Sequence, residues 1–171
     1  QINAAVQHAR IGRGDLDPQQ MTPIGGGERA AVGDIVVTRR NDRRITTEEG
    51  QPIRNRERWH VTDVGPYGAL TVSSATGHGA AVLQGDYVRE HVRLGYAATE
   101  HGYQGETTTI GIELVSDATT RRGLYVGATR GIAENLILVV TDSPDLDEAR
   151  DTLERILTTD RADLPAVTQR R

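Results

Sequence analysis

The chain has 171 residues, a formal net charge of −4 and a sequence pI near 5.7, and all 20 of its basic residues are arginines. This length fits one ordinary domain or a domain with a small insertion, and the negative net charge requires any basic surface for nucleic acids to be local. The absence of lysine excludes a standard P-loop and a Schiff base, and the absence of cysteine excludes disulfides, thiolate catalysis and cysteine-based zinc sites.

The first part of the chain predicts a short helix followed by a linker. Apolar side chains at positions 2, 5, 6 and 9 recur with helical spacing, so we expect a helix that ends near Gly12 or Gly14. From Gly14 to Arg29, an Asp-Pro pair, a Thr-Pro pair and three consecutive glycines favour turns over core.

Short runs of β-branched residues, divided by turns, characterise residues 31 to 92. Extended segments are predicted at Asp34–Arg39, Arg58–Val64, Ala69–Ser73, Ala80–Leu83 and Tyr87–Leu94. Several short strands with tight turns favour a closed or nearly closed barrel of the SH3 or OB type, because closure removes exposed edges.

Strand and helix patterns alternate after Leu94, as in a parallel α/β layer. The predicted elements are strands over Tyr96–Glu100, Ile110–Val115 and Leu136–Thr141, a helix over Arg121–Arg130, and a last helix that starts at Ser143-Pro144 with the serine as its cap. The longest apolar stretch, Leu136–Val140, is too short to span a bilayer, and no signal segment opens the chain. We therefore expect a soluble, cytoplasmic protein.

Arginines concentrate around one predicted hairpin of the barrel. The stretch has four acidic residues but seven arginines, namely Arg39, Arg40, Arg43, Arg44, Arg54, Arg56 and Arg58. This local excess can hold a DNA strand by its phosphates, with Trp59 or Tyr67 available for base stacking if exposed. The alternative stays open, because Trp59 lies in an alternating strand that favours the core and the arginines can pair with nearby acids.

Two later segments carry candidate chemistry. A strand that leads into Thr99, His101, Gln104 and Gly105 would place polar groups at the carboxyl edge of a parallel sheet, where α/β proteins bind ligands, although an ordinary polar loop has the same composition. Arg130 lies between a predicted helix and a buried strand. From there its guanidinium can stabilise phosphate charge, or it can cap helix carbonyls. The five histidines form no metal set.

Taken together, the two segments resemble motifs V and VI of superfamily 1 helicases, most closely the RecD-like branch of TraA-type and TrwC-type conjugative relaxase-helicases. The resemblance rests on the pattern A-x-T-x-H-x-x-Q-G-x-T, which begins at Ala97, and on LYVGATRG, which begins at Leu124. The segments VGDIVVTRRND and GDYVREHVRLGYA are also similar to the barrel insertion of this family. Gly102 and Ile132 depart from the family, which often has basic residues there.

The resemblance implies an α/β fold in which half of a RecA-like parallel sheet with helices is interrupted by an inserted SH3-like barrel. The second RecA-like helicase domain would comprise residues 1–30 and 92–160, the barrel residues 31–91, and a tail residues 161–171. Such a chain would be a monomeric piece of a longer cytoplasmic protein.

For the site, the resemblance implies that Arg130 is the catalytic arginine finger, which reaches the γ-phosphate of ATP. Gln104 and Gly105 would contribute to nucleotide binding, while Thr99 and His101 would touch single-stranded DNA together with Arg39, Arg40, Arg43 and Arg44. ATP and Mg²⁺ would be bound mainly by the N-terminal RecA-like domain of the same parent chain, since this sequence has neither Walker motif.

Two functions of different classes follow. The first is the C-terminal motor domain of an ATP-dependent DNA helicase that moves 5′ to 3′ along single-stranded DNA. The second is a non-catalytic DNA- or protein-binding module derived from a helicase half. The departures at Gly102 and Ile132 motivate the second hypothesis, because both remove positive charge.

Overall fold

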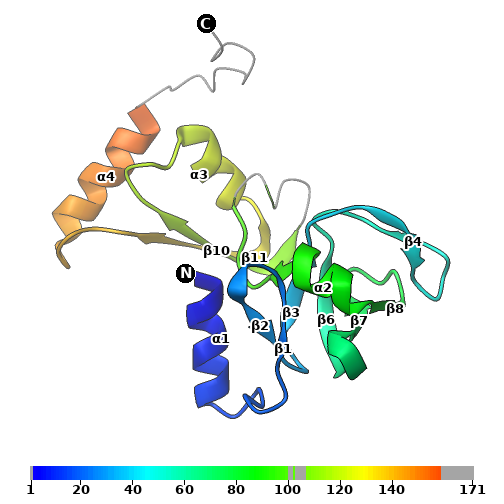
Figure 1. Ribbon diagram of the computed structural model, residues 1–171. Coiled ribbons are helices and arrows are strands. Elements are labelled where there is room, and N and C mark those ends of the chain that lie inside the picture. The colour runs from blue at the N-terminus through cyan, green and yellow to red at the C-terminus, as the bar shows by residue number, and fades with distance from the viewer. Residues whose placement is uncertain (1, 100–101, 103–106, 159–171) are drawn as a thin grey trace, which may run out of the picture. The chain divides into compact units, whose positions relative to one another are not determined.

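The computed structural model describes residues 2–99, 102 and 107–158, and the chain divides into two compact units, Gln1–Ala98 and Thr99–Arg171 (Figure 1). The first unit contains helices α1 (Ile2–Gly12) and α2 (Gly85–His91), the single turns η1 (Gly25–Gly27) and η2 (Pro66–Gly68), and strands β1 (Thr22–Pro23), β2 (Arg29–Ala30), β3 (Ile35–Thr38), β4 (Asp42–Thr46), β5 (Pro52–Ile53), β6 (Arg58–Val64), β7 (Leu70–Ser74), β8 (Ala80–Leu83) and β9 (Val92–Leu94). The second contains β10 (Thr108–Val115), α3 (Arg121–Gly127), β11 (Gly131–Val139) and α4 (Leu146–Thr158).

The main sheet of the first unit is antiparallel and has the strand order β8-β7-β6-β3-β9. Strands β1 and β2 pair with each other, as do β4 and β5, outside this sheet. Across the described residues no ladder joins β8 to β9 or to β4, although Glu48 N donates to Ala80 O over 2.9 Å. Four of the five predicted extended segments are therefore present as strands, but a closed barrel is not formed by the ladders.

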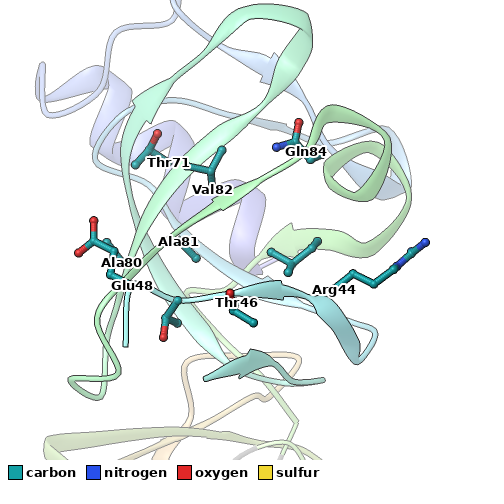
Figure 2. Close-up of a pocket in the computed structure, with 10 residues that line it drawn as sticks. Arg44, Thr46, Glu48, Thr71, Ala80, Ala81, Val82 and Gln84 are labelled. Carbon is teal, nitrogen blue, oxygen red and sulfur yellow. The ribbon is translucent and has the colours of Figure 1, made fainter. Parts of the chain in front are cut away.

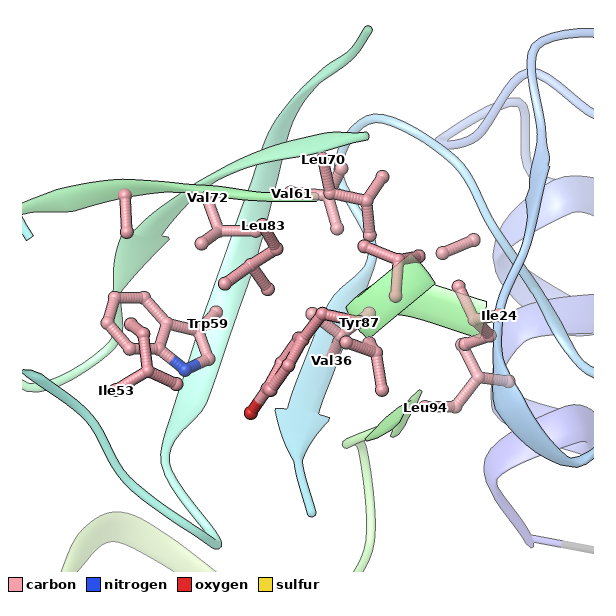
Figure 3. Packing of buried hydrophobic residues seen from close by; sticks show 14 residues of the cluster. Ile24, Val36, Ile53, Trp59, Val61, Leu70, Val72, Leu83, Tyr87 and Leu94 are labelled. Atoms are coloured by element: carbon pink, nitrogen blue, oxygen red, sulfur yellow. The ribbon is translucent and has the colours of Figure 1, made fainter. Parts of the chain in front are cut away.

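Alternation along the strands builds the core of the first unit (Figure 3). Along β6, Trp59 and Val61 are buried whereas His60 and Thr62 are exposed. The buried cluster comprises Ile24, Ala30, Val36, Ile53, Trp59, Val61, Leu70, Val72, Ala81, Leu83, Tyr87, Val88, Val92 and Leu94. Burial of each large apolar side chain stabilises the fold by about 1.5 to 3 kcal/mol, so this cluster is the main source of stability in the unit.

Two expectations for the first unit were wrong. The predicted extended segment Tyr87–Leu94 is helical up to His91, and only β9 is extended. An acid in the first turn and bases in the last turn of α2 suit its dipole, and the Tyr87 and His91 rings meet edge to face at i, i+4 spacing. The predicted linker also contributes to the core, because Ile24 is only 4% exposed.

The second unit is a parallel β-α-β arrangement in which β10 pairs with β11 and a small core joins α3 and α4 to the strands. The predicted strand Tyr96–Glu100 is not formed over residues 96–99, and Glu100 lies outside the described residues. Helix α3 stops at Gly127 rather than Arg130, and β11 begins at Gly131 rather than Leu136.

The cap of α4 also differs from the prediction. The side chain of Asp145, not Ser143, accepts the hydrogen bond from the first turn, from Asp147 N over 2.9 Å. Ser143 Oγ instead donates to Glu148 over 2.6 Å. This bond, followed by the backbone N–H of Asp142, lowers the pKa of Glu148.

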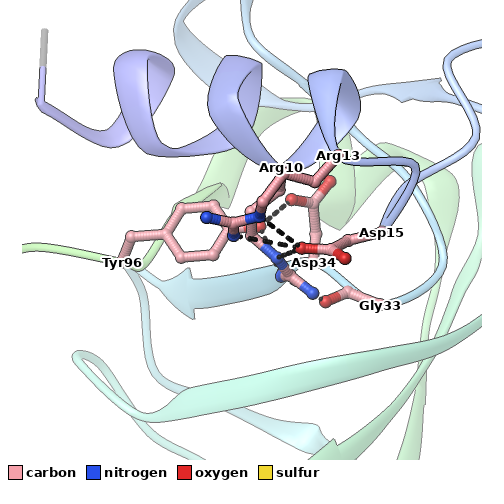
Figure 4. Close-up of polar contacts among 6 residues, drawn as sticks. All are labelled: Arg10, Arg13, Asp15, Gly33, Asp34 and Tyr96. Carbon is pink, nitrogen blue, oxygen red and sulfur yellow. Dashed lines mark hydrogen bonds and ion pairs between the residues drawn. The ribbon is translucent and has the colours of Figure 1, made fainter.

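Helix α1 docks on the first unit with its polar face (Figure 4). Gln7 Nε2 donates to the fully buried carboxylate of Asp34 over 2.7 Å, and Ala31 N donates to the same oxygen over 2.7 Å. Tyr96 OH also donates to Asp34, while Arg10 donates to Tyr96 OH over 2.9 Å. Because buried polar groups must be hydrogen-bonded, these contacts fix α1 and the chain at Tyr96 against one carboxylate.

Replacing that carboxylate tests the account of α1 docking. Asp34→Ala leaves the buried Gln7 amide, the Ala31 N–H and the Tyr96 hydroxyl without their acceptor. Each donor left without a partner costs about 1 to 3 kcal/mol, so we expect the free energy of unfolding to fall by about 3 kcal/mol or more.

Urea unfolding followed by the fluorescence of Trp59, the only tryptophan, measures this change. The control is Asp15→Ala, which removes an exposed carboxylate paired with Arg13 and should cost less than about 1 kcal/mol. Equal decreases in the two variants would contradict a structural role for the Asp34 contacts.

Candidate nucleic-acid interface

The arginine-rich hairpin formed by β4 and β5 is anchored to the core of the first unit. Ile53 is only 1% exposed and belongs to the core cluster. Tyr87, also in that cluster, donates its hydroxyl to the carbonyl of Arg40. Thr38 Oγ1 donates to Arg54 O over 2.6 Å, and Arg56 N donates to Thr38 O over 2.7 Å. The backbone on both sides of the hairpin is therefore held in place.

This anchoring directs two arginines to solvent. Asp42 pairs in register with Ile53, and successive side chains in a strand point to opposite faces. Because Ile53 points into the core, its neighbour Arg54 points away from it, and Arg43 and Arg54 are both exposed. Arg39, just before the hairpin, is exposed as well.

Contacts separate the four arginines predicted to bind DNA into two kinds. Arg44 pairs with Asp42 over 2.7 Å, and Arg40 donates to His91 Nε2 over 3.0 Å. For Arg39 and Arg43 the described part of the chain shows no guanidinium contact, and the same holds for Arg54, which the site prediction did not include. Arg44 is thus neutralised by Asp42, Arg40 keeps its charge beside His91, and Arg39, Arg43 and Arg54 keep guanidinium groups that no contact within the described residues occupies.

The ion pair of Asp42 is a stable feature of the hairpin. Hydrogen bonds from the Arg44 side chain and then from its backbone N–H lower the pKa of Asp42 to about 2. The carboxylate therefore stays charged from mildly acidic to neutral pH, where it pairs with Arg44 and also attracts Arg40.

A cleft of about 380 Å³, lined by both polar and apolar side chains, lies between β4 and the outer edge of β8 (Figure 2). The cleft is lined by Arg44, Ile45, Thr46, Thr47, Glu48, Thr71, Ala80, Ala81, Val82 and Gln84. It marks the seam where the ladders do not close. Figure 2 shows Arg44 and Gln84 at one end of the cleft, with Glu48 and Ala80 at the other.

The two aromatic candidates for base stacking differ sharply. Trp59 is fully buried in the core, as its alternating strand indicated, and offers no stacking surface. Tyr67 is 93% exposed and projects from turn η2. Alternation in the sequence already favoured the core for Trp59, whereas the exposure of Tyr67 depends on the conformation of the turn.

The residues of the first helicase-like motif are only partly described. Thr99 is exposed, has no regular secondary structure, and accepts a hydrogen bond from Gly102 N over 2.8 Å. His101, Gln104 and Gly105 lie outside the described residues. The segment precedes β10, so the expected position at the carboxyl edge of a preceding strand is not observed.

Arg130 lies at the amino end of β11, close to the start of β10. Its carbonyl accepts a hydrogen bond from Thr108 N over 3.0 Å, which brings the ends of the two helicase-like motifs together. Its Nε donates to Val126 O over 2.8 Å, and Nη2 donates to Thr129 Oγ1 over 3.2 Å. The bond to Val126 O caps a carbonyl at the end of α3, which is the alternative to a catalytic role that the sequence left open for Arg130.

One face of the β10–β11 pair is apolar and exposed. In register across the pair, Ile112 faces Leu136 and Leu114 faces Leu138. All four side chains are exposed, up to 67% for Ile112. Parallel sheets are usually covered on both faces, so this face is unusual for such a strand pair.

The described residues contain neither a metal-binding cluster nor a membrane-spanning helix. Across residues 2–99, 102 and 107–158, no cluster of three or more His, Asp or Glu side chains is arranged to hold a metal ion. In the same residues, no helix is long and apolar enough to cross a membrane.

Comparison with known proteins supports the barrel assignment. Residues 24–93 match the family model described as the Rv2311 SH3-like barrel domain. The uncharacterized proteins Rv2311 and MT2373, from two strains of Mycobacterium tuberculosis, are 39% identical to this chain over 79 residues, which is 46% of this chain and 45% of each relative. The match therefore spans less than half of each relative. The chain is mixed α/β, with an SH3-like barrel domain and a small parallel sheet.

A distant structural likeness to a helicase also exists. The crystal structure of a double mutant of Pif1 helicase from Bacteroides aligns with 80% of this chain and 39% of its own, at a TM-score of 0.42 and 18% identity. A likeness at this level leaves function open. The TraA and TrwC branch of the sequence-based prediction therefore stays a prediction.

The tyrosines that anchor the hairpin and α1 give the first unit a predicted alkaline transition. Burial, followed by the charges of Asp42 and Glu57, raises the pKa of Tyr87 to about 12. Burial, followed by the contact with Asp34, raises the pKa of Tyr96 to about 12. The folded state thus stabilises the neutral form of both tyrosines, whose ordinary pKa is near 10. Their stabilisation is complete below pH 10 and disappears as the pH rises from about 10 to 12.

Tyrosinate absorbance and unfolding experiments over this pH range test the assignment. Tyr87→Phe and Tyr96→Phe should each remove one late step from the tyrosinate titration. If the tyrosinate absorbance of the folded protein is already complete near pH 10, the raised pKa values of Tyr87 and Tyr96 are wrong.

Proposed function

We propose that this chain is a non-catalytic module that binds single-stranded DNA through the β4–β5 hairpin of its SH3-like barrel. The observation that carries the proposal is the exposure of the Arg39, Arg43 and Arg54 guanidinium groups, without contacts among the described residues, on an anchored backbone. Arginine binds phosphate in a bidentate manner and stays charged at all relevant pH values. Because the net charge of the chain is −4, the affinity for DNA phosphates has to come from this local arginine surface rather than from the whole protein.

A single strand fits this surface better than a duplex. The unclosed seam beside the hairpin provides a cleft of about 380 Å³, whose mixed lining includes threonines and Gln84 as well as apolar side chains. Unpaired bases can enter such a cleft and hydrogen-bond there, whereas the bases of a duplex stay stacked inside the helix. Phosphate contacts from the hairpin then supply affinity without sequence preference.

The composition of the chain supports a role without ATP hydrolysis of its own, because the sequence has no lysine for a P-loop.

The motor domain of a RecD-like helicase is the second candidate. It is supported by the order of the two helicase-like motifs, by the parallel β10-α3-β11 arrangement and by the exposed apolar face of that sheet, which a larger RecA-like sheet would cover. In this role Arg130 would be the arginine finger, and Gln104 and Gly105 would approach ATP. A separate RecA-like domain would hold ATP and Mg²⁺, and Thr99 and His101 would contact the DNA strand.

The hairpin proposal predicts a defined decrease in DNA binding. Replacing both Arg43 and Arg54 by glutamine removes two guanidinium groups that would bind phosphates, so affinity for a fluorescent oligothymidine should fall about tenfold or more at low salt. The slope of log K against log salt should become shallower by about 0.7 for each phosphate that the variant no longer binds. Fluorescence anisotropy at several salt concentrations measures both quantities.

The matched control carries the same change in net charge elsewhere. Arg13→Gln with Arg150→Gln removes two exposed, ion-paired arginines that lie outside the hairpin. This control should bind DNA like the unchanged chain. If both double variants bind equally weakly, binding reflects net charge alone and the hairpin proposal is wrong.

ATP turnover separates the two candidates. The purified chain should hydrolyse no ATP, with or without single-stranded DNA, because it has no Walker motif. If a longer protein containing this chain hydrolyses ATP, the motor candidate predicts that Arg130→Ala lowers turnover about 10³-fold or more. Unchanged turnover would remove Arg130 from the catalytic role and leave it as the cap of α3.

A further inference from the structure

Tyr67 is an exposed aromatic residue in an unfavourable backbone conformation. Its φ of 59° lies in the left-handed region, which costs a bulky residue about 1 to 2 kcal/mol. Its ring is 93% exposed, so burial returns none of this cost. A residue held in this way is a candidate for function rather than for stability.

The surrounding turn holds Tyr67 rigidly. Arg89 Nη1 donates to the Tyr67 carbonyl over 3.2 Å, and Gly65 N donates to Ala69 O across the turn over 2.9 Å. Gly85 lies against the same carbonyl, since a Cβ on Gly85 would stand 2.2 Å from Tyr67 O. The turn is thus wedged against the start of α2, and the ring projects from a fixed base.

The position of this turn connects it to the cleft. Gly85, which touches the Tyr67 carbonyl, directly follows Gln84, and Gln84 lines the cleft. Figure 2 shows Gln84 at the same end of the cleft as Arg44 of the hairpin. The backbone of turn η2 therefore adjoins the end of the cleft that the hairpin lines through Arg44.

Charge along this line suits a nucleic-acid strand. The guanidinium groups lie at the hairpin end, where phosphates would bind. Two acidic side chains that flank the line are ion-paired, Asp42 with Arg44 and Asp86 with Arg89. These two carboxylates are thus balanced by arginines, which reduces their repulsion of a DNA backbone.

From these observations we infer that Tyr67 is the base-stacking platform of a single-stranded DNA site that runs from the arginine hairpin, past Arg44 and Gln84, to turn η2. This inference rests on the proposed function and adds to it the residue that binds a base rather than a phosphate. Stacking on an aromatic side chain is tolerant of sequence and contributes about 1 to 3 kcal/mol per base. Because the backbone of Tyr67 is already held, only the rotation of its side chain is lost when a base binds, which keeps the entropic cost low.

The test uses the full chain and Tyr67→Asn. Asparagine removes the ring but tolerates a left-handed φ, so the turn is preserved, and an unchanged thermal midpoint checks this. For a fluorescent oligothymidine of about 12 nucleotides, we expect the affinity of Tyr67→Asn to fall about five- to hundredfold, with an unchanged salt slope. On an oligonucleotide of equal length with abasic residues, variant and unchanged chain should bind equally.

Tyr67→Phe is the matched variant, because it keeps the ring and should keep the affinity for oligothymidine. If Tyr67→Asn binds oligothymidine like the unchanged chain while the Arg43 and Arg54 double variant binds weakly, the stacking role is overturned and the hairpin proposal stands. If the unchanged chain binds neither oligonucleotide, both the proposed function and the stacking role are overturned.

Discussion

The anchoring of the β4–β5 hairpin on the core is the constraint on which the proposed interface depends. Ile53 is buried in the same cluster as Trp59, and Tyr87 from α2 joins this cluster while its hydroxyl holds the carbonyl of Arg40. Since side chains alternate along a strand, burial of Ile53 directs Arg54 to solvent. An arginine surface on a fixed backbone can present its charges to phosphates at a lower entropic cost than a flexible arm.

The same core links the interface to the rest of the first unit. Helix α2, which carries Tyr87, begins against the Tyr67 turn at Gly85 and ends beside the arginine hairpin at His91. On the other side, the buried carboxylate of Asp34 joins α1 to Tyr96. Buried side chains such as Tyr87 and Asp34, which have no proposed contact with DNA, thus hold the elements that carry the arginines, the cleft and the exposed ring.

Local patterns in the sequence predicted much of this fold. Alternation identified β6 and β8 with the observed bounds, and it placed Trp59 in the core. It failed for α2, where charges at the helix ends and an i, i+4 ring contact outweigh β-branched composition. The docking of α1 through Gln7 was not predictable from hydrophobic spacing, because a polar face meets a buried carboxylate contributed by a distant part of the chain.

The candidate site was predictable in part. Clustering of arginines in the sequence located the hairpin, but which of them are neutralised depends on pairs such as Arg44 with Asp42 that only the fold reveals. The strained backbone of Tyr67 and the cleft at the unclosed seam have no sequence signal, since both arise from contacts between separate strands and turns. For Arg130, the sequence left a catalytic role and a helix cap as alternatives, and the structure adds the hydrogen bonds of a cap.

The most direct test of the account is the salt dependence of single-stranded DNA binding by the unchanged chain. Three contacting arginines predict that log K falls linearly with log salt, with a slope near −2, at about 0.7 per phosphate contact. Absence of binding at low salt, or an affinity that does not change with salt, would contradict a phosphate-binding role for the hairpin.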